Sequence, residues 1–381
     1  MALRAAIRAS RATGVSLGAL GFFWGGFAAL MPDWQARAGV SDAALGALLL
    51  LSGLGGMAAM ASGPWMQRAL GRRALPILAL QLGLVALMIW TIGAPFSLAL
   101  VLIWLGWSMA GLDIASNVEV SHREAETGLP LMNWNHALFS FGFAAAAALA
   151  GIARQAGVGP GTIMAANGVC VLFAALATRE GVTPVRSAPQ RASFGHSAWT
   201  VVVPAGMILF LAFVAENSTE SWSALHIKRS FGAAAGGGAF GPMMFGLMMG
   251  LGRVFAQMAA AHWGEARLVA LSALLAAIGA ALSAVAPVQW LAVVGIALIG
   301  IGSAVIVPSV NSLLGQRVAH AGRALAMSRA WLIGFTGFFV GPVVMGTIAQ
   351  GAGLRWAFAA IALILIAILP GLARLMRAPQ L

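Results

Sequence analysis

Charged residues are scarce in this sequence. Asp, Glu, Lys and Arg make up 8% of the 381 residues, whereas a soluble domain carries about 25%. Hydrophobic residues make up 61% of the chain. Folded as a water-soluble globule, such a chain could not cover its surface with polar groups. This excludes a cytosolic enzyme, a nucleic-acid-binding protein and a disordered protein, and the sequence belongs in a membrane.

Cysteine is nearly absent as well. Cys170 is the only one, so there is no intrachain disulfide and no cysteine-based metal site. The net charge is +12, but the basic residues occur singly or in twos and threes between apolar runs rather than on one basic face. We expect the partners to be the lipid bilayer and a small-molecule substrate, with no nucleic acid, no metal and no cofactor beyond a coupling ion.

The hydrophobic residues form long uninterrupted runs. A helix needs about 20 apolar residues to cross a hydrocarbon core of about 30 Å. The runs lack the period-two alternation of barrel strands and predict an all-α membrane protein with twelve transmembrane helices. The two longest charge-free stretches are divided at Gly93-Ala94-Pro95 and at Ala286-Pro287. The predicted spans are 12–31, 43–63, 74–92, 97–120, 131–153, 160–178, 199–217, 238–262, 268–286, 290–313, 324–350 and 354–373.

The distribution of basic residues predicts the orientation. If the N-terminus lies inside, fifteen arginines lie in cytoplasmic segments and five basic residues lie outside. Cytoplasmic loops carry the excess of Lys and Arg. This predicts a multi-pass protein of the bacterial inner membrane with the N- and C-termini cytoplasmic. The sequence leaves the oligomeric state open and is compatible with a monomer.

The chain also divides into two halves. A polar segment, 181–197, predicts a cytoplasmic linker between an N-terminal six-helix bundle, 1–180, and a C-terminal six-helix bundle, 198–381. Several Met and Gly residues of the first half recur 195 positions later in the second half. This predicts parallel repeats with substrate bound between them. The matching pairs are Met132 and Met327, Gly142 and Gly337, Gly151 and Gly346, Gly46 and Gly241, and Gly55 and Gly250.

Twelve spans arranged as six plus six look like the major facilitator superfamily. The loop after the second span resembles the G-x-x-x-D-R-x-G-R-R motif of that superfamily, which acts in gating on the cytoplasmic side. Here Gln67 replaces the Asp and one extra residue precedes Gly71, so the resemblance implies a basic turn without an aspartate relay. The gate candidates are Gly63, Gln67, Arg68, Gly71, Arg72 and Arg73, with Glu119, Glu124 and Arg253 at facing helix ends.

A narrower resemblance runs through spans four and five. The pattern Asp113, Asn117, Glu124, Met132, His136, Ser140 and Gly142 is similar to the fucose-permease-like group and related sugar or drug permeases. The segments Ser221-Trp222-Ser223 and Gly252-Arg253, together with Glu216, resemble the same group. The resemblance implies a secondary active transporter of a small organic solute, working by alternating access with proton coupling, and no enzyme activity.

Other functions remain open at this point. A polyspecific drug or metabolite efflux antiporter is the nearest alternative. A membrane enzyme would have to use His122, Glu124 and His136, which lack metal-ligand spacing and a nucleophile motif. A channel would need a filter or a ring of like charges, and the sequence has no such pattern.

Ionisable residues inside apolar spans are the main functional candidates, because they are costly there. Asp113 lies in span four with Asn117 one turn on, on the same face. Glu216 follows the apolar run 199–215. Asp113 and Glu216 are the candidates for binding and releasing a coupling proton. The alternatives are a structural carboxylate paired with an arginine at the inner gate for Asp113, and a solvated helix end for Glu216.

Polar and aromatic side chains beside these carboxylates are the substrate-binding candidates. The structural alternatives are loop anchoring for His136, an interfacial anchor for Trp222, snorkelling of the long side chain for Arg329 and a gate salt bridge for Glu119. The substrate-binding candidates are Trp24, Asn117, Asn133, His136, Trp222 and Arg329.

Overall fold

The computed structural model describes residues 2–178 and 198–379. The predicted linker 181–197 lies outside the described residues, as does the side chain of Gln67. Within the described ranges every regular element is helical. This confirms the predicted all-α class for that part of the chain.

The first group of helices comes from the N-terminal part of the chain. It consists of α1 (Ala2–Ala9), α2 (Arg11–Ala29), α3 (Met31–Ala38), α4 (Asp42–Leu70), α5 (Ala74–Met88), α6 (Pro95–Thr127), α7 (Met132–Gln155) and α8 (Pro160–Ala177). Two short 3-10 turns, η1 (Gly71–Arg73) and η2 (Ile89–Thr91), flank α5.

The second group comes from the C-terminal part. It consists of α9 (Trp199–Ser230), α10 (Phe240–Trp263), α11 (Glu265–Val285), α12 (Gln289–Ser303), α13 (Ile306–Arg317), α14 (His320–Ala352), α15 (Leu354–Ile366) and α16 (Ile368–Arg377). The turn η4 (Gly237–Ala239) precedes α10.

Eleven helical segments of the described residues are long and apolar enough to cross a membrane, and each coincides with a predicted span. The predicted span 238–262 corresponds to α10, which is not one of the eleven. Its 24 residues would extend about 36 Å, and part of it lies outside the described side chains, so twelve spans stay a prediction. The largest boundary error is at α9, predicted to end at 217 and observed to continue to Ser230.

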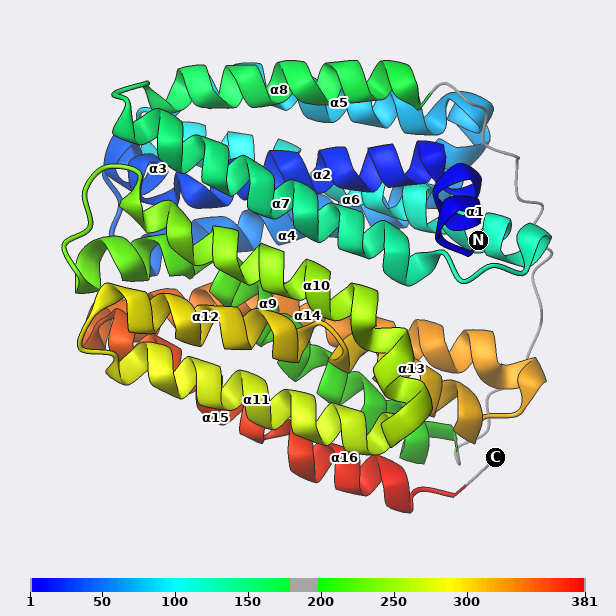
Figure 1. Ribbon diagram of the computed structural model, residues 1–381. Coiled ribbons are helices and arrows are strands. Elements are labelled where there is room, and N and C mark those ends of the chain that lie inside the picture. The colour runs from blue at the N-terminus through cyan, green and yellow to red at the C-terminus, as the bar shows by residue number, and fades with distance from the viewer. Residues whose placement is uncertain (1, 179–197, 380–381) are drawn as a thin grey trace.

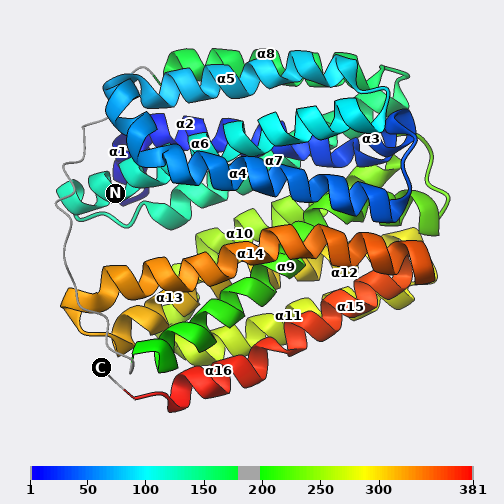
Figure 2. The same cartoon turned by 180° about the vertical axis from the view of Figure 1, so that it is seen from behind.

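The two helical groups lie side by side along their length. Helices α2 to α8 occupy the upper part of Figure 1 and α9 to α16 the lower part, and the reverse view in Figure 2 shows the same division. Both chain ends lie at the same end of the molecule (Figures 1 and 2). We call this end the terminal face and the opposite end the distal face.

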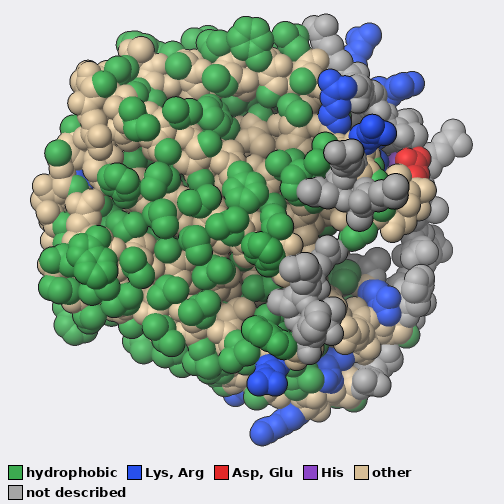
Figure 3. Space-filling model, in the orientation of Figure 1, with side chains coloured by type: hydrophobic (Ala, Val, Ile, Leu, Met, Phe, Trp, Pro, Cys, Tyr) green, Lys and Arg blue, Asp and Glu red, His purple; other side chains and the backbone are tan. Residues whose placement is uncertain are grey.

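The outer surface is that of a membrane protein. Hydrophobic side chains cover most of the face seen in Figure 3, while Lys and Arg gather at the edge near the terminal face. Apolar surface of this extent is stable against lipid and not against water. The chain is therefore a multi-pass membrane protein. Among its most exposed large side chains are Phe96, Phe173, Val285, Trp290 and Leu363.

Glycines let helices approach closely within and between the two groups. A Cβ on Gly142 of α7 would lie 2.3 Å from the backbone oxygen of Gly18 on α2, and a Cβ on Gly337 of α14 would lie 2.4 Å from that of Phe210 on α9. Gly142 and Gly337 are separated by the repeat offset of 195, so they occupy equivalent positions in the two groups. Small residues take this role where no hydrophobic force drives helix association.

Polar contacts join the two groups at the distal face. The guanidinium of Arg229, at the end of α9, donates to Asp42 of α4 (2.6 Å) and to the carboxamide oxygen of Gln35 on α3. The Gln35 amide group donates to Asp42 in turn (2.7 Å). The backbone N–H of Asp42 donates to Gln350 of α14 (3.2 Å). The distal face is therefore closed by bonds between the groups.

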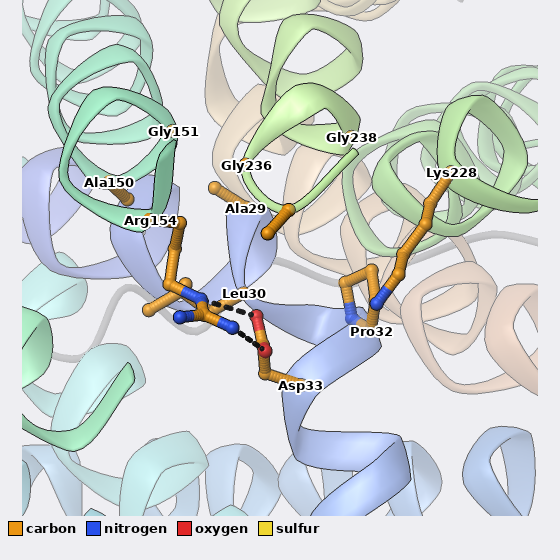
Figure 4. Close-up of a pocket in the computed structure, with 11 residues that line it drawn as sticks. Ala29, Leu30, Pro32, Asp33, Ala150, Gly151, Arg154, Lys228, Gly236 and Gly238 are labelled. Atoms are coloured by element: carbon orange, nitrogen blue, oxygen red, sulfur yellow. Dashed lines mark hydrogen bonds and ion pairs between the residues drawn. The ribbon is translucent and has the colours of Figure 1, made fainter. Parts of the chain in front are cut away.

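The loop between α9 and η4, in the second group, packs against α7 of the first group at the distal face. Arg154 of α7 pairs with Asp33 of α3 (2.8 Å), and Gly236 lies next to this pair (Figure 4). Gly236 has φ +82°, and a Cβ there would lie 2.2 Å from the backbone oxygen of Gly151. Only glycine combines this backbone conformation with such a close approach.

Candidate functional site

Two glutamates lie in the middle of α9 rather than at its end. Glu216 is 8% exposed and Glu220 is 6% exposed. The helix continues past the charges because its polar side chains find partners. The amide of Asn217 donates to the backbone oxygen of Phe338 (2.7 Å), and the Thr219 hydroxyl donates to the backbone oxygen of Ala215 (2.8 Å). The solvated helix end considered for Glu216 is therefore wrong.

Arg253 of α10 connects Glu216 to the other helical group. Its guanidinium donates to Glu216 (3.3 Å), to the Ser140 hydroxyl (2.7 Å) and to the backbone oxygen of His136 (3.1 Å). The Arg253 and Glu216 side chains are 14% and 11% exposed. Arg253, expected at the cytoplasmic gate, thus forms an enclosed bridge between α9, α10 and α7.

The bridge continues to Asp113 through two side chains. His136 Nε2 and Asn117 Oδ1 are 3.0 Å apart, which joins α7 to α6. Asn117 lies one turn from Asp113 and interacts with its carboxyl group, and Asp113 also experiences the charge of Arg253. The predicted shared face of Asp113 and Asn117 is therefore present, and His136 contacts this pair rather than anchoring the loop before α7.

Trp24 bonds to Glu220, which interacts with Glu216 and Arg253 through charge rather than through a described hydrogen bond. Its indole Nε1–H, on α2, donates to Glu220 on α9 over 2.8 Å. The Trp24 ring stacks on Phe27, with centroids 5.8 Å apart. We call the connected side chains of Asp113, Asn117, His136, Ser140, Arg253, Glu216, Glu220 and Trp24 the central polar network.

Several predicted site residues lie elsewhere. Trp222 is 0% exposed, so it is neither an interfacial anchor nor open to a solute. Asn133 is half-buried, Arg329 is exposed, and neither bonds to the central polar network among the described contacts. Glu119 pairs with Arg123 on its own helix (2.8 Å). Glu124 accepts the backbone N–H groups of Leu131 and Met132 (2.6 and 2.8 Å) and so caps the start of α7.

The predicted gate loop lies exposed at the terminal face. Arg68, Arg72 and Arg73 are exposed, whereas Gly63 is buried beside Ile114 of α6. Gly71 has φ +50°, a conformation that favours glycine at this turn. The proposed gating role of this loop would operate when the terminal face is closed. It therefore stays a prediction.

Aromatic side chains of α9 and α14 form a cluster whose mutual contacts were not predicted from the sequence. Phe213 of α9 packs against Phe338, Trp331 and Phe335 of α14, with ring centroids 4.5, 5.5 and 5.7 Å apart. The Trp331 indole donates to Asn311 of α13 (3.0 Å). The sequence carries no signal for this cluster, because single aromatic residues are common in apolar spans. A group of His, Cys, Asp and Glu able to hold a metal ion is not found among the described residues.

Arg253 should be essential for stability. Arg253→Leu leaves the buried carboxylate of Glu216 without its cation, which should cost about 3 kcal/mol. Thermal unfolding of the purified protein, followed by tryptophan fluorescence, should shift down by several degrees. The double variant with Glu216→Gln should recover most of the loss, since no buried charge then lacks a partner. A double variant as unstable as Arg253→Leu alone would show that the ion pair is not the cause.

An apolar body with a polar network between two helical groups is typical of membrane transporters. The sequence model of the Major Facilitator Superfamily matches residues 205–380. An uncharacterized MFS-type transporter of Yersinia pestis is 29% identical over 353 residues, covering 90% of this chain and 89% of its own. Membrane protein MosC of Rhizobium meliloti is 27% identical over 322 residues, covering 82% and 77%.

Solved structures agree in fold. The nucleoside transporter NupG has a TM-score of 0.72 at 13% identity and covers 97% of this chain and 100% of its own. A bacterial homolog of the human lysosomal transporter Spinster, inward-facing and occupied, has a TM-score of 0.73 at 14% identity and covers 96% of each chain. The family match covers most of the C-terminal group of helices, and the solved transporter structures share the fold of both groups.

Proposed function

We propose that this protein is a secondary active transporter that moves a small organic solute across the bacterial inner membrane by alternating access, coupled to protons. The observation that supports this most strongly is the central polar network. It places three carboxyl groups and one guanidinium between two helical groups of an otherwise apolar body. Buried ionisable groups in a membrane are retained for ion or substrate pathways.

The halves 1–180 and 198–381 act as the two moving units of this proposal, joined by the cytoplasmic linker 181–197. The terminal face is cytoplasmic in this proposal, because twelve of the fifteen arginines predicted to be cytoplasmic lie in described segments that reach it. The bonds from Arg229 to Asp42 and Gln35 close the distal face. A hollow between the groups is visible near the terminal face in Figure 3. The arrangement is therefore inward-facing.

The residues divide by role. Asp113 and Glu216 bind and release the coupling proton. The solute contacts Asn117 and His136 of the central polar network. Trp24 borders it on the distal side, and Asn133 and Arg329 lie nearer the cytoplasm. Glu124 and His136, which a membrane enzyme would need, are bonded to backbone N–H groups and to Asn117. This favours a carrier over an enzyme.

Export of amphipathic solutes in exchange for protons is the second candidate. The cluster of Phe213, Trp331, Phe335 and Phe338 favours it, because aromatic rings on the helix that carries Glu216 suit an apolar solute with a polar end. Both candidates use the same network and differ in the direction of solute movement.

Counterflow in proteoliposomes tests the proposed function. A thermal-shift screen against sugars, nucleosides, organic acids and amphipathic cations supplies the solute. Vesicles loaded with unlabelled solute should accumulate labelled solute transiently and with saturation, because a carrier exchanges one molecule for another. Flux that rises linearly with concentration would indicate a channel, and chemical conversion of the solute would indicate an enzyme.

A further inference from the structure

Among the described contacts Glu220 has no ion pair, whereas the other two buried glutamates, Glu119 and Glu216, each pair with an arginine. Glu216, one turn earlier on α9, pairs with Arg253 (3.3 Å). Glu220 accepts only the neutral indole N–H of Trp24 (2.8 Å) among the described hydrogen bonds. An ionised carboxylate buried without a cation is unfavourable in a membrane interior.

The charges near Glu220 come from two residues. Glu216 on α9 repels an ionised Glu220, and Arg253 on α10 attracts it while already bonded to Glu216, Ser140 and His136. Helix α2 contributes only Trp24 to this contact. The other elements packed against α9 carry their charged residues towards the membrane ends, namely Asp33, Arg37, Arg317, Arg323, Arg329, Arg355, Arg374 and Arg377, and α2 carries Arg11 at its terminal end. Helix α9 itself carries His226, Lys228 and Arg229 towards its distal end.

The Trp24–Glu220 bond also crosses between the two helical groups. Trp24 lies on α2 of the first group and is 7% exposed, and Glu220 lies on α9 of the second group and is 6% exposed. Moving the groups apart at the distal face would break this bond and admit water to the carboxylate.

We propose that Glu220 is a proton-binding site that controls the distal face: it is protonated while the distal face is closed and ionised once that face is open. A proton from the distal side binds the water-exposed carboxylate, which removes the charge and lets the halves close over it. Proton binding thus favours the closed arrangement, because only the neutral form is compatible with the dry contact to Trp24. The inference rests on the proposed function and adds Glu220 to the proton sites proposed there, Asp113 and Glu216.

The test measures opening of the distal face directly and needs no solute. Spin labels are attached at Ala36→Cys and Ala352→Cys, two exposed distal positions on different helical groups, with Cys170→Ser removing the native thiol. All proteins also carry Asp113→Asn, so that its titration does not contribute. Distances are measured by pulsed electron paramagnetic resonance in nanodiscs from about pH 6 to about pH 9.

We expect the distal-open fraction of the parent to rise about tenfold over this range, the change that a difference of one pH unit in proton affinity between two states produces. Glu220→Gln should remain closed at every pH, because glutamine mimics the neutral form. Glu126→Gln, at an exposed position on α6, should behave like the parent. Trp24→Phe should keep the pH dependence with a displaced midpoint, since the carboxyl group remains and its donor is lost.

A pH-independent parent, or a Glu220→Gln variant that titrates like the parent, would overturn the proposal. Loss of the titration in Glu216→Gln with retention in Glu220→Gln would assign the proton to Glu216 instead and would equally overturn it. If Glu220→Gln does not fold, the Trp24→Phe variant provides the test instead. An unchanged midpoint in the pH dependence of its distal-open fraction would contradict a role for the contact between Trp24 and Glu220. The counterflow assay is independent of these outcomes, so failure of the transport proposal is recognised separately.

Discussion

Asp113→Asn should abolish accumulation of solute driven by a pH gradient while leaving solute exchange intact. Asparagine has the shape of the protonated carboxyl group and can still interact with Asn117, but it cannot release a proton. With a gradient of about two pH units, a carrier that couples one proton to one solute accumulates the solute up to about 100-fold. The variant should reach a ratio of about one, measured as labelled solute in proteoliposomes.

Exchange measured on the same vesicles is the internal control for this prediction. Accumulation at the wild-type level would rule out Asp113 as the coupling site and make Glu216 the next candidate. Loss of exchange together with accumulation would make Asp113 a ligand of the solute instead. Glu126→Gln provides a matched variant, since it neutralises an exposed carboxylate of the same helix.

Gly346→Ala should prevent closure of the distal face. A Cβ at this position of α14 would lie 2.5 Å from the backbone oxygen of Asp42 and 3.1 Å from the Cα of Gly46 on α4. Both atoms belong to the backbone of the other helical group and cannot rotate away. Overpacking of this kind costs about 1–3 kcal/mol, so exchange should fall by about tenfold or more and the distal spin labels should report the open distance.

Gly351→Ala is the matched control for this change. It lies five residues further along α14, and a Cβ there would meet nothing within 4 Å. Its exchange rate and label distances should match those of the wild type. Equal effects of the two substitutions would show that α14 is sensitive to alanine in general, and the closure argument would fail.

The spans were predictable because length and hydropathy decide them. The sequence indicated each of the eleven apolar helical segments, since a run of about 20 apolar residues leaves few alternatives in a membrane. The end of α9 was missed because the apolar run 199–215 stops at Glu216, and Glu220 follows one turn further on. Their burial depends on Arg253 and Trp24, which belong to other helices. The local sequence around Glu216 and Glu220 does not indicate these partners.

The site was predictable in its members and not in its connections. Asp113 and Asn117 share a face because of helical spacing, which the sequence contains. The contact from Asn117 to His136, and that from Trp24 to Glu220, arise only from how α6, α7, α2 and α9 pack. Tertiary contacts also explain why Trp222, conspicuous in the sequence, is enclosed.

The central claim, that solute and protons move together, is tested most directly by recording pH during transport. Wild-type protein in lightly buffered proteoliposomes is given the solute selected by the thermal-shift screen, and the external pH is followed alongside labelled solute. The account predicts a pH change that tracks solute flux, alkaline for symport and acidic for antiport, and that is absent in Asp113→Asn vesicles. Saturable solute flux through the wild-type protein without any proton movement would contradict it.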